Sequence, residues 1–143
     1  MKILEAFKLA ATLTAGQVDK AGRPYIEHLT RVFLRVCEAG GDRIQQIAAL
    51  LHDAIEDGRT SADDLLKAGV PREAVGLVLI LTKETGQTYA SYVLGIKAHE
   101  QAILVKLCDL ADNSDPERLA LLDAATADRL RTKYDKARAL LVA

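Results

Sequence analysis

The sequence predicts an all-α protein, built as a compact multi-helix bundle. Apolar residues recur at helical spacing through most of the chain, and capping residues and glycines separate the periodic stretches. The one apolar run that resembles a buried strand has no second strand to pair with. Half of the 143 residues are apolar, which suffices for one well-buried core and is too few for two ordinary domains. We therefore expect a single domain over residues 1–143.

The first three predicted helices each carry one apolar stripe. An opening helix is expected from the spacing of Ile3, Phe7 and Ala10. A Gly-bearing loop at 15–24 follows and leads the chain into His28. The stripes of the next two helices are formed by Ile26, Leu29, Phe33 and Val36, and by Ile44, Ile47, Ala48, Leu51 and Ile55.

Capping residues divide these stretches. Gly40 and Gly41 end the helix at 26–36, and Asp42 is a suitable N-cap for the helix that follows. Gly58 stands in the usual C-terminal position after the last acids of that second helix. The two helices should therefore form a helical hairpin.

The middle of the chain predicts two further helices. Ser61, with Asp64 three residues on, resembles a capping box for a short helix that ends at Gly69. Pro71 suits the first turn of the next helix. The run at 75–81 is continuous and rich in β-branched residues, so periodicity alone does not distinguish helix from buried strand. We predict a helix because no partner strand exists.

Residues 88–112 predict one or two more helices. Asp115-Pro116 then starts a polar, Arg-rich C-terminal stretch with inward apolar positions at Leu119, Leu122, Leu130, Ala137 and Leu141. The expected total is seven or eight helices.

Composition narrows the class of partner. Lys and Arg total 19 and Asp and Glu total 20, so no charge excess indicates nucleic acid or an anionic membrane. The N-terminus becomes charged too early for a signal peptide, and no apolar run approaches a membrane-spanning length. Cys37 and Cys108 fit reduced, buried thiols better than a disulfide or a sulfur-ligated zinc. A cytoplasmic protein that binds a small molecule is expected, with an undetermined oligomeric state.

An adjacent His52-Asp53 pair, followed by Glu56 and Asp57, is the strongest chemical feature of the chain. We predict that the helix continues through them, so that His52 with Glu56 and Asp53 with Asp57, each four apart, form two adjacent rows. Three carboxylates then crowd the negative end of the helix and call for a compensating cation. Imidazole and carboxylate together suit Mn²⁺, Fe²⁺ or Zn²⁺. The alternative, a solvated acidic helix end, accounts for Glu56 and Asp57 but leaves His52 beside Leu51 unexplained.

His28 and Asp109 are further candidate ligands, and His99 is the remaining histidine of the chain. His28 by itself is typical of a hydrogen-bonded boundary histidine, and gains weight only from the other ligand types. Asp109 interrupts an apolar run, where an acid should avoid burial unless it is paired or metal-bound; an ion pair with Lys106 is the alternative. His99 has only polar neighbours and is expected on the surface.

Three motifs occur in order along the chain. They comprise Gly16-Gln17, Lys20, Gly22 and Pro24-Tyr25-Ile26 with His28; Leu50-Leu51-His52-Asp53 with Glu56-Asp57; and Val105-Lys106-Leu107 with Asp109 and Asn113. Together they resemble the HD-domain phosphohydrolases, in particular the hydrolase domain of the RelA/SpoT alarmone enzymes and the small stand-alone alarmone hydrolases. The resemblance runs from about residue 16 to residue 113.

The resemblance implies a metal site and a substrate. One divalent metal, usually Mn²⁺, would be held by His28, His52, Asp53 and Asp109. Glu56 and Asp57 would be the catalytic acids that orient water or take its proton. The implied reaction is the hydrolysis of guanosine 3′,5′-bispyrophosphate to the 5′-nucleotide and pyrophosphate.

Substrate contacts follow in the same way. Lys20 and Lys106 would balance the pyrophosphate, and Asn113 would reach the ribose. Arg23 is added as a nearby cation that the family does not fix. Tyr89 would flank the nucleotide, although a helical tyrosine is more often a core residue with a solvated hydroxyl.

The sequence departs from the family where the substrate is chosen. Asp19 stands where an arginine is usual, Thr14 replaces a common histidine, and Ser114-Asp115-Pro116 replaces a segment that helps to hold the nucleotide. Asp19 should therefore weaken attraction for a highly anionic alarmone. A phosphatase acting on another nucleotide or a nicotinamide cofactor phosphate is one alternative, and a non-catalytic nucleotide sensor is another. The Glu56-Asp57 pair argues against the sensor.

Overall fold

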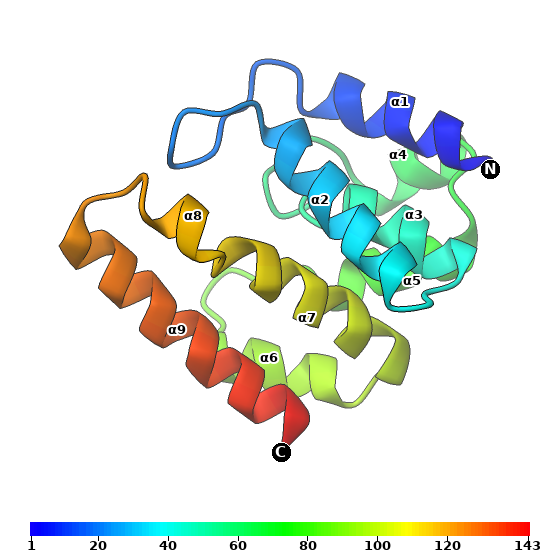
Figure 1. Cartoon of the computed structure of the whole chain (residues 1–143). Coiled ribbons are helices and arrows are strands. Elements are labelled where there is room, and N and C mark those ends of the chain that lie inside the picture. The colour runs from blue at the N-terminus through cyan, green and yellow to red at the C-terminus, as the bar shows by residue number, and fades with distance from the viewer.

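Helices make up all the regular structure of the computed structural model, which describes residues 1–143 (Figure 1). Only an isolated bridge between Val18 and Pro24 has β-type pairing. The predicted all-α class is thus confirmed. The nine helices are Ile3–Leu13 (α1), Tyr25–Glu38 (α2), Arg43–Leu51 (α3), Ala62–Lys67 (α4), Arg72–Ile80 (α5), Tyr89–Lys97 (α6), Glu100–Asn113 (α7), Pro116–Leu119 (α8) and Ala124–Val142 (α9).

Helix α7 is the central element of the bundle. It packs against α2 and α3 on one side and against α6 and α9 on the other (Figure 1). The core contains 26 buried apolar residues, among them Ile47, Leu50 and Leu110, which are fully buried. Each such side chain contributes about 1.5–3 kcal/mol through burial. Helices α2, α3 and α7 therefore form a tightly packed centre.

The hairpin of α2 and α3 forms as the capping residues predict. Gly40 adopts φ +82°, the left-handed conformation that ends many helices. Asp42 then caps α3 in a complete capping box, accepting from the Gln45 backbone while the Gln45 side chain accepts from the Asp42 backbone. Ser61 likewise caps α4 by accepting from the backbone of Asp64.

The helix around position 52 is shorter than predicted. It ends at Leu51, and residues 52–58 form successive turns. The His52 Nδ1 atom lies 2.7 Å from the carbonyl oxygen of Ala49, the acceptor that the Asp53 N–H needs for the next helical turn. The imidazole thus competes with continuation of the helix. Glu56 and Asp57 consequently project from a turn segment, and the expected rows of acids on one helix are wrong.

The structure has nine helices instead of seven or eight because the C-terminal stretch divides in two. Asp123 starts α9 afresh, accepting from both the backbone N–H and the hydroxyl of Thr126. Residues 88–112 form two helices, and the run at 75–81 lies largely in α5, as predicted. None of the nine helices is both long and apolar enough to cross a membrane.

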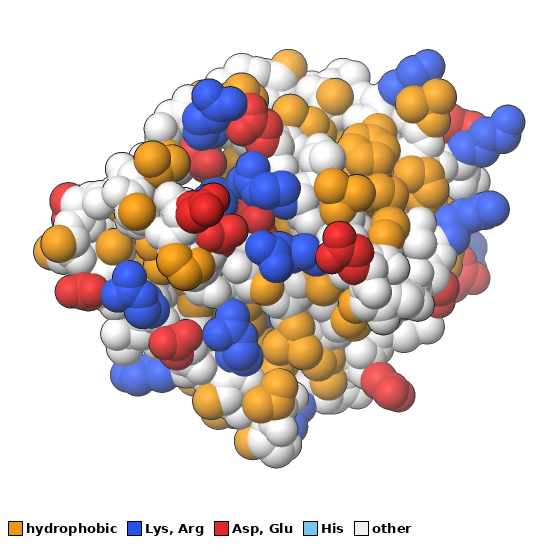
Figure 2. All heavy atoms as spheres, in the orientation of Figure 1, with side chains coloured by type: hydrophobic (Ala, Val, Ile, Leu, Met, Phe, Trp, Pro, Cys, Tyr) orange, Lys and Arg blue, Asp and Glu red, His pale blue; other side chains and the backbone are white.

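Basic and acidic side chains intermingle on the molecular face shown in Figure 2. This distribution agrees with the nearly balanced charge of the sequence.

Candidate metal centre and its cavity

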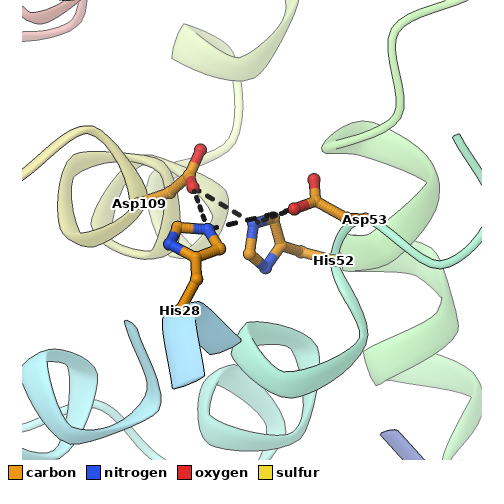
Figure 3. A group of neighbouring side chains, drawn as sticks. All are labelled: His28, His52, Asp53 and Asp109. Carbon is orange, nitrogen blue, oxygen red and sulfur yellow. Dashed lines mark hydrogen bonds and ion pairs between the residues drawn. The ribbon is translucent and has the colours of Figure 1, made fainter. Parts of the chain in front are cut away.

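Four predicted ligands meet at one point of the structure (Figure 3). His28 comes from α2, Asp109 from α7, and His52 and Asp53 from the turn that follows α3. One ligand atom of each residue lies within 4.8 Å of all the others. Asp109 Oδ1 is 3.1 Å from His28 Nε2 and 3.2 Å from His52 Nε2. Asp53 Oδ2 is 3.2 Å from His52 Nε2 and 4.0 Å from His28 Nε2.

The outer faces of both imidazoles are already occupied. His28 Nδ1 lies 2.6 Å from Asp112 Oδ2, and His52 Nδ1 lies 2.7 Å from the Ala49 carbonyl. Both partners are acceptors, so each Nδ1 carries the donated proton. Each Nε2 lone pair then faces carboxylate oxygens, an arrangement that is repulsive unless a proton or a metal cation lies between them. Two nitrogens and two oxygens suit a borderline divalent cation, and the residues therefore fit a metal.

Electrostatics keep the central carboxylate ionised. Burial opposes ionisation of Asp109, but Lys106 and His52 outweigh it and hold the pKa of Asp109 well below its usual range. Lys106 Nζ lies 2.9 Å from Asp109 Oδ2. The ion pair that the sequence offers as an alternative to metal binding is therefore present together with the ligand cluster. The hydroxyl of Tyr25 donates to Asp53 Oδ2. Burial and Asp53 raise the pKa of Tyr25, which keeps it a donor.

Beside the cluster opens a cavity of about 370 Å³, lined by 19 residues. It is walled by the loop before α2, by α6 and α7, and by the α8–α9 region. Its acidic lining residues are Asp19, Asp53, Glu56 and Asp109. Its cationic lining residues are Lys20, Lys83, Lys106, Arg118 and Lys133. Metal-ligand chemistry and an anion-attracting wall therefore share one cavity.

Most of the predicted substrate residues line this cavity, namely Lys20, Lys106, Tyr89 and Asn113. Asn113 donates from Nδ2 to Asp109 Oδ1 at 3.1 Å. Tyr89 is half-buried, and Lys133 Nζ lies 4.4 Å from the centroid of its ring. Glu56 also lines the cavity, and its Oε1 accepts from the Lys83 backbone at 2.6 Å.

Among the predicted catalytic and substrate-binding residues, two lie apart from the cavity lining. Arg23 pairs with Glu27 at 2.8 Å on the surface and is 61% exposed. Asp57 Oδ2 accepts from Gln17 Nε2 at 2.9 Å, outside the cavity wall. Burial raises the pKa of the Asp57 carboxyl. His99 is exposed at the start of α7, as predicted.

The Asp19 carboxylate has its charge balanced within the protein. It accepts from the backbone N–H groups of Ala21 and Arg23 at 2.9 and 3.0 Å. Its other oxygen pairs with Arg118 Nη2 at 3.0 Å. Burial opposes its ionisation, but these hydrogen bonds prevail and lower the pKa of Asp19. Asp19 is therefore a paired charge, and the expectation that it weakens attraction for a highly anionic alarmone stays a prediction.

The other departures from the family have local structural roles. The hydroxyls of Thr14 and Ser114 donate to the carbonyls of Ala10 and Leu110, four residues earlier in each case. Asp115 caps α8 by accepting from the backbone of Glu117.

Sequence reasoning did not assign roles to Tyr25, Lys83, Asp112, Arg118 or Lys133. For Asp112 a usable signal existed: it lies three residues after Asp109, which places both acids on the same face of α7. The remaining four stand in segments whose local pattern carries no ligand spacing. Only the fold shows that they border the metal cluster or the cavity.

Comparisons with known proteins agree with this architecture. A guanosine-3′,5′-bis(diphosphate) 3′-pyrophosphohydrolase of Aquifex aeolicus is 33% identical over 120 residues, which are 78% of this chain and 17% of that protein. A probable enzyme of the same name from Mycoplasma pneumoniae is 36% identical over 110 residues, 77% of this chain and 15% of that protein. The chain thus spans less than a fifth of the length of these relatives.

The fold has a close counterpart among solved structures. A metazoan ortholog of SpoT that hydrolyses ppGpp superposes with a TM-score of 0.82 at 24% identity, covering 97% of this chain and 84% of that one. The family described as HD domain matches residues 6–143. This match covers nearly the whole chain, which therefore belongs to the HD domain family.

Proposed function

We propose that this protein is a metal-dependent phosphohydrolase that removes pyrophosphate from guanosine 3′,5′-bispyrophosphate. The observation that carries the proposal is the meeting of four metal-ligand atoms beside a cavity with five cationic lining residues. Relatives from Aquifex aeolicus and Mycoplasma pneumoniae carry the name of this activity and support the choice of substrate.

The HD domain implies a divalent metal, and we propose Mn²⁺ held by His28, His52, Asp53 and Asp109. When bound, such a cation supplies Lewis-acid polarisation of a phosphoryl group and of water. The side chains of the four ligands are 2–21% exposed, which leaves Asp53 the most accessible of them. Substrate would therefore approach the centre from the side of Asp53 and the cavity.

Around this centre the proposed roles of the other residues follow from their positions. Glu56 lines the cavity with its carboxylate fixed by the Lys83 backbone, and can accept a proton from an attacking water. Asp57 lies next to it and would orient Glu56 and the turn. Direct attack by water requires no covalent nucleophile.

The lysines supply the anion-binding wall. Burial and repulsion by Lys20 and Lys106 lower the pKa of Lys133, which indicates crowded positive charge that a pyrophosphate group would relieve. Asn113 would contact the ribose, and Tyr89 would flank the nucleobase.

One observation favours a less anionic substrate. Lys106 and Arg118 are already paired with Asp109, Asp112 and Asp19, which leaves three lysines of the cavity without an ion pair within 4.0 Å. A phosphatase acting on another nucleotide or a nicotinamide cofactor phosphate would need fewer free cations. This is the second candidate function.

Turnover of a nucleotide panel in the presence of Mn²⁺ tests the proposal. Guanosine 3′,5′-bispyrophosphate should release pyrophosphate, and the His52→Ala variant should not catalyse its release. Turnover of a monophosphorylated nucleotide alone would replace the first candidate with the second. Absence of turnover across the panel, with metal bound, would point to a sensor instead.

We also propose that the protein acts in the cytoplasm on a small-molecule partner. Cys37 and Cys108 are both free thiols, which suits a reducing compartment. Cys108 is buried as expected, whereas Cys37 is only partly buried. Alkylation of free thiols in freshly lysed cells, which shows whether Cys37 and Cys108 are reduced, tests this assignment.

A further inference from the structure

We propose that Asp112 and Arg118 form a positioning pair that holds His28 with its Nε2 atom directed at the metal centre. Neither residue belongs to the four-ligand cluster. The inference rests on the metal site proposed above, and it concerns how one ligand of that site is oriented.

Asp112 is fully buried and is surrounded by donors. Its Oδ2 atom lies 2.6 Å from His28 Nδ1 and 2.8 Å from Arg118 Nη1, while its Oδ1 atom lies 2.8 Å from Arg31 Nε. Its side chain is 0% exposed, so these contacts replace all of its hydration. Three permanently charged guanidinium groups, those of Arg31 and Arg118 and that of Arg35 at 3.9 Å, keep it in the carboxylate form.

This arrangement determines which nitrogen of His28 is free. A carboxylate only accepts hydrogen bonds, so with a metal cation on the Nε2 side the proton of the imidazole resides on Nδ1, where Asp112 accepts it at 2.6 Å, and the lone pair on Nε2. Nε2 is the atom that lies 3.1 Å from Asp109 Oδ1 in the ligand cluster. A metal-binding histidine is commonly oriented by such a carboxylate, which also increases the basicity of the ligating nitrogen.

The two histidines of the centre are held by different means. His52 donates to the Ala49 carbonyl, a backbone group three residues away on its own segment. His28 depends on a side chain 84 positions away, and on the contacts that hold that side chain. Substitution of Asp112 or of its partners can therefore change the orientation of His28, whereas the orientation of His52 is fixed by a backbone carbonyl of its own segment.

Arg118 differs from Arg31 in its place within the network. Arg118 shares the same carboxylate oxygen with His28 and also bonds the Asp112 carbonyl at 3.1 Å. Its second nitrogen reaches Asp19 in the loop that borders the cavity. Arg31 contacts only the opposite oxygen of Asp112 and is more exposed, at 37% against 22%. Arg118 thus joins the cavity wall to the histidine ligand.

Positioning and simple electrostatics predict opposite effects of removing Arg118. Loss of a cation near the site should strengthen the binding of a divalent metal through reduced repulsion. Loss of a positioning contact should weaken it, because His28 and Asp112 gain freedom. Removal of Arg31 takes away the same charge without loosening the oxygen that His28 uses, which makes Arg31→Gln the matched control.

The experiment measures Mn²⁺ affinity of the full chain by calorimetry for wild type, Arg118→Gln, Asp112→Asn and Arg31→Gln. We expect Asp112→Asn and Arg118→Gln to bind Mn²⁺ roughly 10-fold more weakly, the lower end of the usual range for such outer partners. Arg31→Gln should bind as tightly as wild type or more tightly. Circular dichroism verifies folding, and Arg118→Gln decides the matter if Asp112→Asn does not fold.

A second readout follows the proton itself. In the Zn²⁺-loaded protein, the His28 Nδ1–H should give a slowly exchanging imidazole resonance by NMR, and its exchange should accelerate in Arg118→Gln but not in Arg31→Gln. Unchanged or tighter Mn²⁺ binding by Arg118→Gln, with His52→Ala losing the metal, overturns the positioning pair alone. Wild-type protein that binds no divalent ion overturns the metal site and the pair together.

Discussion

His28 and Asp112 lie 84 positions apart in the sequence, and the imidazole Nδ1 of His28 donates to Asp112 Oδ2 at 2.6 Å. The bond crosses the packed interface between α2 and α7, and both side chains are almost completely buried. The orientation of a candidate metal ligand is thereby tied to helix packing. Substitutions at that interface should therefore disturb the orientation of His28 at the metal centre before they unfold the bundle.

Removal of a candidate ligand should abolish metal binding. His52→Ala and Asp109→Ala each leave three ligands, so we expect loss of metal and of turnover while most helicity is retained. Elemental analysis of purified protein provides the measurement, and His99→Ala, an exposed histidine outside the centre, is the control. A full equivalent of metal in either ligand variant would contradict the assignment.

Replacement of Glu56 should affect chemistry more than metal binding. Glu56→Gln keeps the shape and the acceptor used by the Lys83 backbone but removes the basic carboxylate. Metal content should persist while kcat falls by ~10²-fold or more, the common scale of general acid–base catalysis. Asp57→Asn should lose less, because that side chain contacts Gln17 outside the cavity wall.

Steady-state kinetics measure both variants, with Glu84→Gln as an exposed acidic control. Near-normal turnover by Glu56→Gln would assign the proton transfer to another group. Equal losses in Glu56→Gln and Asp57→Asn would show that the two acids act as a unit.

Asp19→Arg should impair the protein, although an arginine is usual at this position in the family. The substitution removes the acceptor for the Ala21 and Arg23 backbones and places a second cation beside Arg118. We expect the free energy of unfolding to fall by about 1.5–3 kcal/mol, since hydrogen bonds to a charged acceptor are lost from the loop. The KM for guanosine 3′,5′-bispyrophosphate should rise. Thermal unfolding and kinetics test this, and a lower KM with unchanged stability would return Asp19 to the role of a free charge.

The Asp19 contacts should also add a defined pH dependence. Its pKa in the folded protein lies below the ordinary value of 3.8, so the stabilisation is complete above that value and is lost as pH falls through the folded pKa. The difference in free energy of unfolding between wild type and Asp19→Asn should be constant near neutrality and shrink below pH 3.8. Urea titrations from pH 7 to pH 3 measure it. A difference that shrinks only at higher pH would contradict the assignment.

Local features of the sequence were sufficient for much of the helical framework. Periodic apolar residues and the caps at Asp42 and Ser61 act within one or two helical turns, so they predict helix positions without knowledge of the fold. The end of α3 was predicted wrongly because the His52 imidazole competes for the backbone carbonyl of Ala49. A hydropathy pattern does not report hydrogen bonds between a side chain and the backbone. The extra break before α9 was missed because apolar spacing continues across it.

The types of the four candidate ligands, and the order of the motifs that contain them, could be read from the sequence because they depend on residue identity and short spacing. Only tertiary structure decided that Arg118 neutralises Asp19 and that Lys133 borders the cavity. Partners separated by about a hundred positions meet only after α2, α7 and α8 have packed. Their contacts therefore arise from the burial of apolar faces elsewhere in the chain, which no local pattern encodes.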